Sequence, residues 1–153
     1  HFLETYLKLE KLRLSEKLSY KIDMDVSTEL DRIMIPNMII QPFVENAILH
    51  GISPKKGGGT LLVKFIEDET IMSCQITDSG IGYFNSIQKK SNIGQNKKNN
   101  RRSLGIRNVN DRVEALNRIF NFNIQYKITT LADSEGVSEG TKVLITFSKI
   151  LNY

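Results

Sequence analysis

The sequence predicts a single α+β domain, a two-layer α/β sandwich in which helices cover one face of a mixed, mostly antiparallel sheet. The hydrophobic periodicity gives the order helix, strand, helix, strand, strand, loop, helix, strand, strand. The length of 153 residues, with 40% hydrophobic and 25% charged residues, is typical of one globular domain with a core of normal size.

The first half predicts two helices and one strand. Residues 2–18 place apolar side chains among glutamates and lysines, which indicates a helix with one buried stripe. Residues 20–26 alternate apolar and polar types, as a half-buried strand does. Pro36 suits the first turn of the next helix, and Pro42 predicts a kink or an irregular first turn. The apolar residues on one side of that helix are Phe43, Val44, Ala47 and Ile48.

The second half predicts two pairs of strands on either side of a long loop and a helix. Residues 60–67 and 70–78 indicate strands joined by a tight hairpin. Residues 83–103 are rich in asparagine, lysine and arginine without periodicity, and a loop of this length in a compact domain tends to be functional. The remaining elements are a helix over 104–120 and strands over 123–131 and 141–150.

Composition excludes several classes of site. The single cysteine, Cys74, permits no internal disulfide and no multi-cysteine zinc site, and its apolar surroundings predict a buried, inert thiol. No run approaches the ~20 apolar residues that a membrane helix requires. The net charge of +4 is concentrated in residues 83–103, which carry six basic residues and no acid. Because the chain does not begin with methionine, we expect it to be a fragment of a longer protein.

The stretch "VENAILHG" places three polar groups on an otherwise apolar helix. In an α-helix, Asn46 and His50 would lie about 40° apart at the border of the apolar stripe, with Glu45 beside them. An amide oxygen there could hold Mg²⁺, which takes few protein oxygens and shares substrate phosphates. A neighbouring carboxylate could accept a proton from a nucleophile. The alternative is that these side chains only satisfy local backbone groups.

Two further motifs follow strands or turns. In "DSGIG", Asp78 ends a strand and could accept a hydrogen bond from an exocyclic amine such as that of adenine, while Gly80 and Gly82 would let a flat ring approach the backbone. An ordinary strand-ending turn is the alternative. In "EGT", Thr141 precedes the last strand and could offer its hydroxyl to a phosphate or to the Asp78 carboxylate, although a turn and a strand-forming threonine explain it equally.

The segment "RRSLGIRNVNDR" predicts a helix start after the basic loop. Free N–H groups at a helix N-terminus attract phosphate, and Arg101, Arg102 and Arg107 add positive charge while Gly105 removes bulk. A solvated basic loop leading into a surface helix is the alternative. The sequence contains no P-loop ending and no dinucleotide fingerprint.

Together, the order and spacing of these motifs resemble the ATP-binding domain of bacterial sensor histidine kinases. That domain belongs to the superfamily of gyrase, MutL and the heat-shock ATPases, whose ATP-binding fold is the Bergerat fold. Residues 35–51, "IPNMIIQPFVENAILHG", resemble the asparagine box of the subfamily with the pattern QPxVENAxxHG. The resemblance covers nearly the whole chain, and "FLETYLKLEKLRL" is similar to the segment that precedes this box.

The resemblance implies ATP and Mg²⁺ as cofactors and a role for each site residue. Asn46 would hold Mg²⁺, Glu45 would polarise the attacking histidine, and Asp78 would accept the adenine amino group. His50 would have a secondary role, such as a phosphate contact or support of the helix end. The adenine pocket would also involve Gly80, Gly82 and Thr141, and phosphate contacts would come from Arg102, Leu104 and Gly105.

The resemblance also implies a domain organisation and partners. Residues 1–19 would be a linker helix from an upstream dimerisation domain, and residues 20–153 the catalytic ATP-binding domain, with an ATP lid at about 83–103. We expect the phosphoacceptor histidine to lie upstream, because the segment after His1 aligns with the linker helix. The expected partners are ATP, that histidine-bearing domain in a homodimeric parent protein, and a response regulator. We expect a cytoplasmic domain of a parent in the bacterial inner membrane.

One departure from the family pattern leaves alternatives open. Arg101, Ser103 and Gly105 stand where the family often has three glycines. A non-catalytic nucleotide-sensing module of the same fold would explain that change. A nucleic-acid-binding protein using the basic loop is a further alternative, which would show steeply salt-dependent binding. Because this loop offers no aromatic side chains beyond Tyr83 and Phe84, we expect no nucleic-acid partner.

Overall fold

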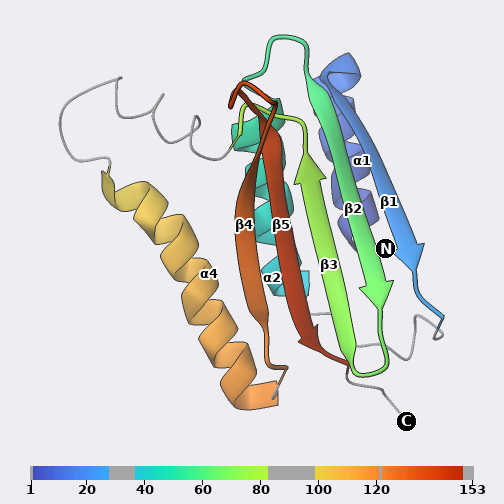
Figure 1. Ribbon diagram of the computed structural model, residues 1–153, viewed down its shortest axis with the longest axis vertical. Helices are drawn as coiled ribbons and strands as arrows, with labels where there is room; N and C mark the ends of the chain where they lie inside the picture. The colour runs from blue at the N-terminus through green and yellow to red at the C-terminus, as the bar shows by residue number, and fades with distance from the viewer. Residues whose placement is uncertain (1, 28–36, 83–98, 121, 150–153) are drawn as a thin grey trace.

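The computed structural model describes residues 2–27, 37–82, 99–120 and 122–149, without the side chains of residues 37, 38 and 99–108. Five strands form one sheet in the order β1-β2-β3-β5-β4 (Figure 1). β1 and β2 are parallel, and the other neighbouring strands are antiparallel, so the predicted mixed and mostly antiparallel sheet is confirmed. The strands are β1 (Leu18–Asp25), β2 (Gly59–Glu67), β3 (Ile71–Asp78), β4 (Gln125–Ala132) and β5 (Ser138–Ser148).

The helices form the second layer. α1 and α2 lie together behind the sheet in the view of Figure 1, while α4 runs beside β4 and also packs against α2. α1 ends in a short 3₁₀ turn that leads directly into β1, and α2 continues into a π-helical segment. These elements are α1 (Phe2–Leu14), η1 (Ser15–Lys17), α2 (Asn37–Asn46), η3 (Ala47–Ile52) and α4 (Asn99–Phe120).

The core lies between the sheet and α2 with η3. Alternate residues of the three central strands face the helices and are buried, as the period of two requires. The four apolar residues predicted to share one side of this helix are all buried, two in α2 and two in η3, which confirms that stripe. Cys74 is also fully buried, and burial raises the pKa of its thiol to about 12. The central-strand residues are Leu61, Val63, Phe65, Met72, Cys74, Ile76, Val143, Ile145 and Phe147.

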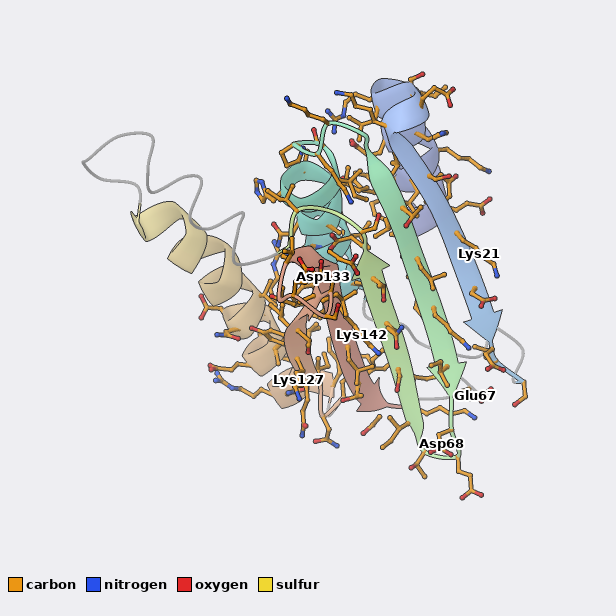
Figure 2. The ribbon with its side chains drawn as sticks, turned by 45° about the horizontal axis from the view of Figure 1, so that its top comes forward. Lys21, Glu67, Asp68, Lys127, Asp133 and Lys142 are labelled. Carbon is orange, nitrogen blue, oxygen red and sulfur yellow. The ribbon has the colours of Figure 1, made fainter. Side chains whose placement is uncertain are left out.

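The opposite face of the sheet carries polar side chains. Lys21, Lys127 and Lys142 lie on β1, β4 and β5, in the alternate positions that do not face the core (Figure 2). Among the described residues, helices therefore cover one face of the sheet only, as the sequence predicts.

Several boundaries and one stripe differ from the predictions. Residues 2–18 form a shorter helix than predicted, and only Leu7 of α1 is fully buried, because Leu9 and Leu12 face outward. α4 begins at Asn99, five residues before the predicted start, so the last part of the predicted loop is helical. Residues 83–98 of the predicted lid lie outside the described residues.

Pro42 lies within α2 and not in an irregular first turn. It is the sixth residue of α2, and the backbone stays α-helical around it. A proline lacks the N–H that would donate to the carbonyl four residues back. At Pro42 the missing hydrogen bond is therefore one to the first turn of α2, while the φ that the ring fixes suits a helix. The irregular winding comes later, in η3, where the Ser53 N–H donates to the Ile48 carbonyl at 2.8 Å, five residues back. Pro36 lies outside the described residues.

In the part of the chain that the structure describes, no helix is both long enough and apolar enough to cross a membrane.

Candidate functional site

Asp78 is a buried carboxylate at the end of a central strand. It is the last residue of β3, opposite Leu61 of β2 and Thr141 of β5 in the register of the sheet. Its exposed fraction is 4%, and Thr141 is also buried. A carboxylate with so little exposure requires hydrogen-bond donors around it, because water cannot solvate it.

Three donors from the chain meet this carboxylate. The Gly80 N–H donates to Asp78 Oδ1 at 2.8 Å, and the hydroxyl and the backbone N–H of Thr141 also hydrogen-bond to the carboxyl group. Burial raises the pKa of Asp78 to about 6, while these donors and the charge of Lys55 act in the opposite direction. Asp78 is therefore mostly ionised at pH 7. Because an ionised carboxylate offers about four acceptor sites, three donors leave room for one more.

The backbone around Asp78 is packed too tightly for side chains at two glycines. A Cβ on Gly51 of η3 would fall 2.7 Å from Asp78 Oδ1, and one on Gly80 would fall 2.2 Å from the carbonyl carbon of Gly51. The Ile81 N–H also donates to the Gly51 carbonyl at 3.0 Å. These contacts join the end of η3 to the turn after β3.

The turn after β3 also meets the start of β5 through glycines. Gly82 has a φ of +81°, and a Cβ there would overlap Ser138 Oγ. Gly140 has a φ of +151°, and its Cβ would fall 1.9 Å from the Asp78 carbonyl oxygen. Both positions favour glycine for conformational and steric reasons. Residues up to about 60 positions apart in the sequence thus form one cluster at one end of the sheet (top in Figure 1). They are Asp78, Gly80, Gly82 and Thr141.

The residues predicted on the helix lie just before this cluster. Asn46 is the last residue of α2 and is exposed, while Glu45 is half-buried and accepts a hydrogen bond from Gln41 Nε2 at 2.7 Å. His50 is half-buried in η3, next to Gly51. The expected angle of about 40° between Asn46 and His50 assumes α-helical winding, so it does not apply here. The π-helical winding of residues 47–52 turns the chain less per residue, and such segments are frequent at functional sites.

The predicted phosphate-binding segment forms the first turns of α4. Arg102 is the fourth residue of this helix, and Leu104 and Gly105 are the sixth and seventh. The free N–H groups of a helix belong to its first four residues, so here they belong to 99–102 and not to the surroundings of Gly105. The side chains of these residues lie outside the description.

Sequence reasoning missed four contributors to the cluster: Gly51, Lys55, Ser138 and Gly140. Lys55 stands in "SPKKGGG", a stretch whose composition indicates only a loop, yet its Nζ donates to the Ser79 carbonyl beside Asp78. Gly51 and Gly140 lie within the motifs "VENAILHG" and "EGT", and their place beside His50 and Thr141 is the signal that could have identified them. Among the described residues, no group of three or more His, Cys, Asp or Glu side chains could hold a metal ion.

The sequence is similar to those of sensor histidine kinases. It is 32% identical over 114 residues to the sensor histidine kinase YpdA of Escherichia coli (strain K12), which covers 74% of this chain and 19% of YpdA. It is 33% identical over 113 residues to the uncharacterized protein YwpD of Bacillus subtilis (strain 168), covering 73% of this chain and 38% of YwpD. The chain thus spans well under half the length of both relatives. No family model matches the chain.

The fold is that of histidine-kinase domains. The mycobacterial sensor histidine kinase MprB superposes with a TM-score of 0.60 at 14% sequence identity, covering 98% of this chain and 93% of the MprB chain. At that identity the likeness concerns the fold alone. The predicted fold class, a helix-covered mixed sheet of the histidine-kinase type, is confirmed.

Proposed function

We propose that the chain is the ATP-binding catalytic domain of a two-component sensor histidine kinase. The reaction is transfer of the γ-phosphoryl group of ATP to a histidine on a separate dimerisation domain. The observation that carries this proposal is the buried Asp78 carboxylate, which holds three donors from the chain and has capacity for one more. The adenine amino group is a donor of the type that this remaining site would accept.

The residues present fit an adenine nucleotide with Mg²⁺. Asp78 and Thr141 would bind the adenine amino end, and Gly80 and Gly82 would shape that pocket by letting the turn after β3 pack closely against Gly51 and Ser138. Asn46 would offer its exposed amide oxygen to Mg²⁺, a cation that needs few protein ligands when phosphates supply the others. When bound, Mg²⁺ neutralises charge on the phosphates. The first turn of α4, which carries Arg102 and the free N–H groups, would meet the phosphates, with Leu104 and Gly105 in the next turn. The lid expected over 83–103 would then end in the helical residues 99–103.

Glu45 and His50 would act beside the phosphates. The Glu45 carboxylate is held by Gln41 Nε2 and would accept the proton of the attacking histidine. Its charge also reaches Tyr6 of α1, whose pKa burial raises to about 12 with smaller contributions from Glu10 and Glu45. Glu45 is therefore near the helix that we propose links this domain to the histidine-bearing one. His50 would support the helix end or contact a phosphate.

The parent protein would place this domain in the cytoplasm and anchor itself in the bacterial inner membrane. Residues 1–19 would lead from the upstream dimerisation domain, so the parent would be a homodimer. A response regulator would receive the phosphoryl group from the histidine. These partners follow from the proposed reaction, because transfer to a histidine requires a domain that carries the acceptor and a protein that then receives the phosphoryl group.

Nucleotide binding tests the proposed site. We expect the chain to bind ATP in calorimetric titrations, and Asp78→Asn to weaken ATP and ADP about 10- to 100-fold with or without Mg²⁺, because it removes a charged acceptor. Asn46→Ala should mainly abolish the Mg²⁺ dependence. Asp68→Asn, at an exposed carboxylate in the β2–β3 turn, is the matched control and should bind normally. Unaltered affinity in both site variants would refute the assignment.

Phosphotransfer tests the catalytic part of the proposal. Alone, the chain should bind ATP without labelling itself, because we expect the acceptor histidine on the separate dimerisation domain. Adding the parent's histidine-bearing dimerisation domain should yield phosphohistidine, and Glu45→Gln should slow that step more than it weakens ATP. Binding without any transfer to the added domain would identify a non-catalytic nucleotide sensor instead.

A further inference from the structure

Lys55 lies in the turn between η3 and β2, and its side chain reaches the residue after Asp78. Its Nζ donates to the Ser79 carbonyl oxygen at 2.5 Å. The turn itself is fixed, because the Lys55 N–H donates to the Ile52 carbonyl at 3.0 Å and the Lys55 carbonyl accepts from the Gly58 N–H at 3.1 Å. The ammonium group is therefore directed at one peptide bond by an ordered backbone.

That peptide bond, between Ser79 and Gly80, is held at both ends by opposite charges. Its carbonyl accepts from the Lys55 ammonium group, and its N–H donates to Asp78 Oδ1 at 2.8 Å. A cation at the carbonyl oxygen polarises the peptide and makes its N–H a stronger donor. Lys55 thus acts on the Asp78 carboxylate in two ways, through the peptide and through its own field.

The surroundings leave this peptide little freedom to reorient. The Ser79 N–H donates to the Thr60 carbonyl at 3.0 Å, and Ser79 Oγ accepts from the Thr60 N–H at 2.9 Å. On the other side, Gly80 is packed against Gly51. Because the Ser79–Gly80 peptide dipole is fixed in this orientation, it stabilises the Asp78 carboxylate without having to reorient first.

The positive charge of Lys55 also lowers the pKa of Asp78, against the effect of burial. The other titratable groups beside the backbone that contacts Asp78 are His50, which precedes Gly51 in η3, and Glu139 and Lys142, which flank Gly140 and Thr141 in β5. Lys142 occupies the alternate strand position to Thr141, so it belongs to the opposite face of the sheet.

We propose that Lys55 is a positioning residue for amine recognition at Asp78. It holds the Ser79–Gly80 peptide so that the Asp78 carboxylate stays ionised and oriented toward an incoming amino group. This inference rests on the proposed nucleotide-binding function and adds a residue outside the sequence motifs to it. A lysine that merely tied the turn to β3 would stabilise the fold without altering the ionisation of Asp78.

The ionisation of Asp78 in the nucleotide-free protein tests the inference directly. We expect an NMR titration of its side-chain carboxyl carbon to show a midpoint at higher pH in Lys55→Met, since a stabilising cation is lost. Lys55→Arg should restore the midpoint, and Lys56→Met, at the exposed neighbouring lysine, should not move it. An unchanged midpoint in folded Lys55→Met overturns the inference, even if nucleotide binding falls. Should Lys55→Met fail to fold, Lys55→Gln, which keeps a donor but no charge, decides the same question.

Binding measurements separate this inference from the proposed function. Lys55→Met should bind ADP roughly threefold more weakly at pH 7 and recover part of that loss at pH 8.5, where Asp78 is ionised again. Lys56→Met should bind as the parent does at both pH values. If the parent bound no adenine nucleotide, the proposed function would fail, while the Asp78 titration would still decide whether Lys55 acts on that carboxylate.

Discussion

Gly80, in the turn after β3, lies against Gly51 of η3 so closely that a Cβ on Gly80 would fall 2.2 Å from the Gly51 carbonyl carbon. The contact joins the helix that carries Asn46 to the strand that ends in Asp78. Backbone meets backbone here, so neither partner can give way as the end of a flexible side chain would. This contact between glycines, together with the hydrogen bond from the Ile81 N–H to the Gly51 carbonyl, therefore holds the two halves of the proposed nucleotide site against each other.

Gly80→Ala is expected to destabilise the protein and to weaken nucleotide binding. The added methyl group would force η3 and the turn after β3 apart, and overpacking of this kind costs about 1–3 kcal/mol. Urea denaturation should show this loss in the free energy of unfolding. Gly57→Ala is the control, since no atom lies within 4 Å of a Cβ built there. Equal stabilities of the two variants would contradict the close contact.

Asp78→Asn is expected to stabilise the nucleotide-free protein at pH 7. Folding raises the pKa of this carboxyl group from its ordinary 3.8 to about 6, so the ionised form is less favourable in the folded protein than in the unfolded chain. The resulting penalty is absent below pH 4, grows between pH 4 and 6, and reaches at most about 3 kcal/mol above pH 6. The amide avoids the charge, so we expect a gain of about 1–3 kcal/mol at pH 7.

Urea denaturation of Asp78→Asn and the parent at pH 7 and pH 4 measures this effect. The difference in the free energy of unfolding should shrink toward zero at pH 4, where the parent carboxyl group is largely protonated in the folded state. Asp68→Asn should show no comparable gain at pH 7, because that carboxylate is exposed. A loss of stability at pH 7 would mean that hydrogen bonds to the ionised carboxylate outweigh its burial.

Much of the fold could be predicted because its elements have strong periodicity. The buried residues could be predicted from the alternation in β2 and β3 and from the apolar side of α2. The tight turn after Glu67 indicates that β2 and β3 form a hairpin. The start of α4 could not be predicted in this way. Residues 99–103 have no apolar stripe, and asparagine, arginine and serine there read as a loop.

Some residues of the candidate site could likewise be predicted from the sequence, and others could not. Asp78 and Gly80 stand in a recognisable motif, whereas Lys55 acts through a single hydrogen bond to a backbone carbonyl, and a lysine in a turn carries no signal of that role. The π-helical winding of η3 also escapes prediction, because residues 47–52 have an ordinary helical composition. Side chain to backbone contacts of this kind depend on the tertiary structure and not on the local pattern.

Asn117→Ala tests another contact of that kind, between α4 and the segment before β4. Asn117 Oδ1 accepts from the Ile124 N–H at 2.6 Å, and its Nδ2 donates to the Ile124 carbonyl at 3.1 Å. Ile124 is 2% exposed, so removing the amide would leave its backbone groups without these partners. We expect a loss of about 1–3 kcal/mol in the free energy of unfolding, measured with urea.

Asn110→Ala on the same helix is the matched control for that variant. Its side chain accepts one exposed hydrogen bond, from the Tyr126 hydroxyl at 2.6 Å, so we expect a loss below about 1 kcal/mol. If both substitutions cost the same, the double hydrogen bond of Asn117 would not be what anchors α4 to the sheet.

Lys149→Met is expected to be among the most destabilising changes outside the core. Lys149 forms an ion pair with Glu67 at the end of the strands remote from Asp78, where the two side chains are 14% and 5% exposed (Figure 2 labels Glu67). Glu67 Oε2 also accepts from the Ser27 N–H and hydroxyl, so removal of the lysine would leave a buried carboxylate with these donors but without its cation. Removing one partner of a buried ion pair costs up to about 3–5 kcal/mol, and the Ser27 donors reduce that cost here. Lys8→Met is the control, because its pair with Glu4 is exposed and an exposed ion pair contributes little to stability. Thermal or urea unfolding at pH 7 should separate the two variants clearly, and a Lys149→Met protein as stable as Lys8→Met would show that the Glu67 carboxylate is satisfied without its lysine.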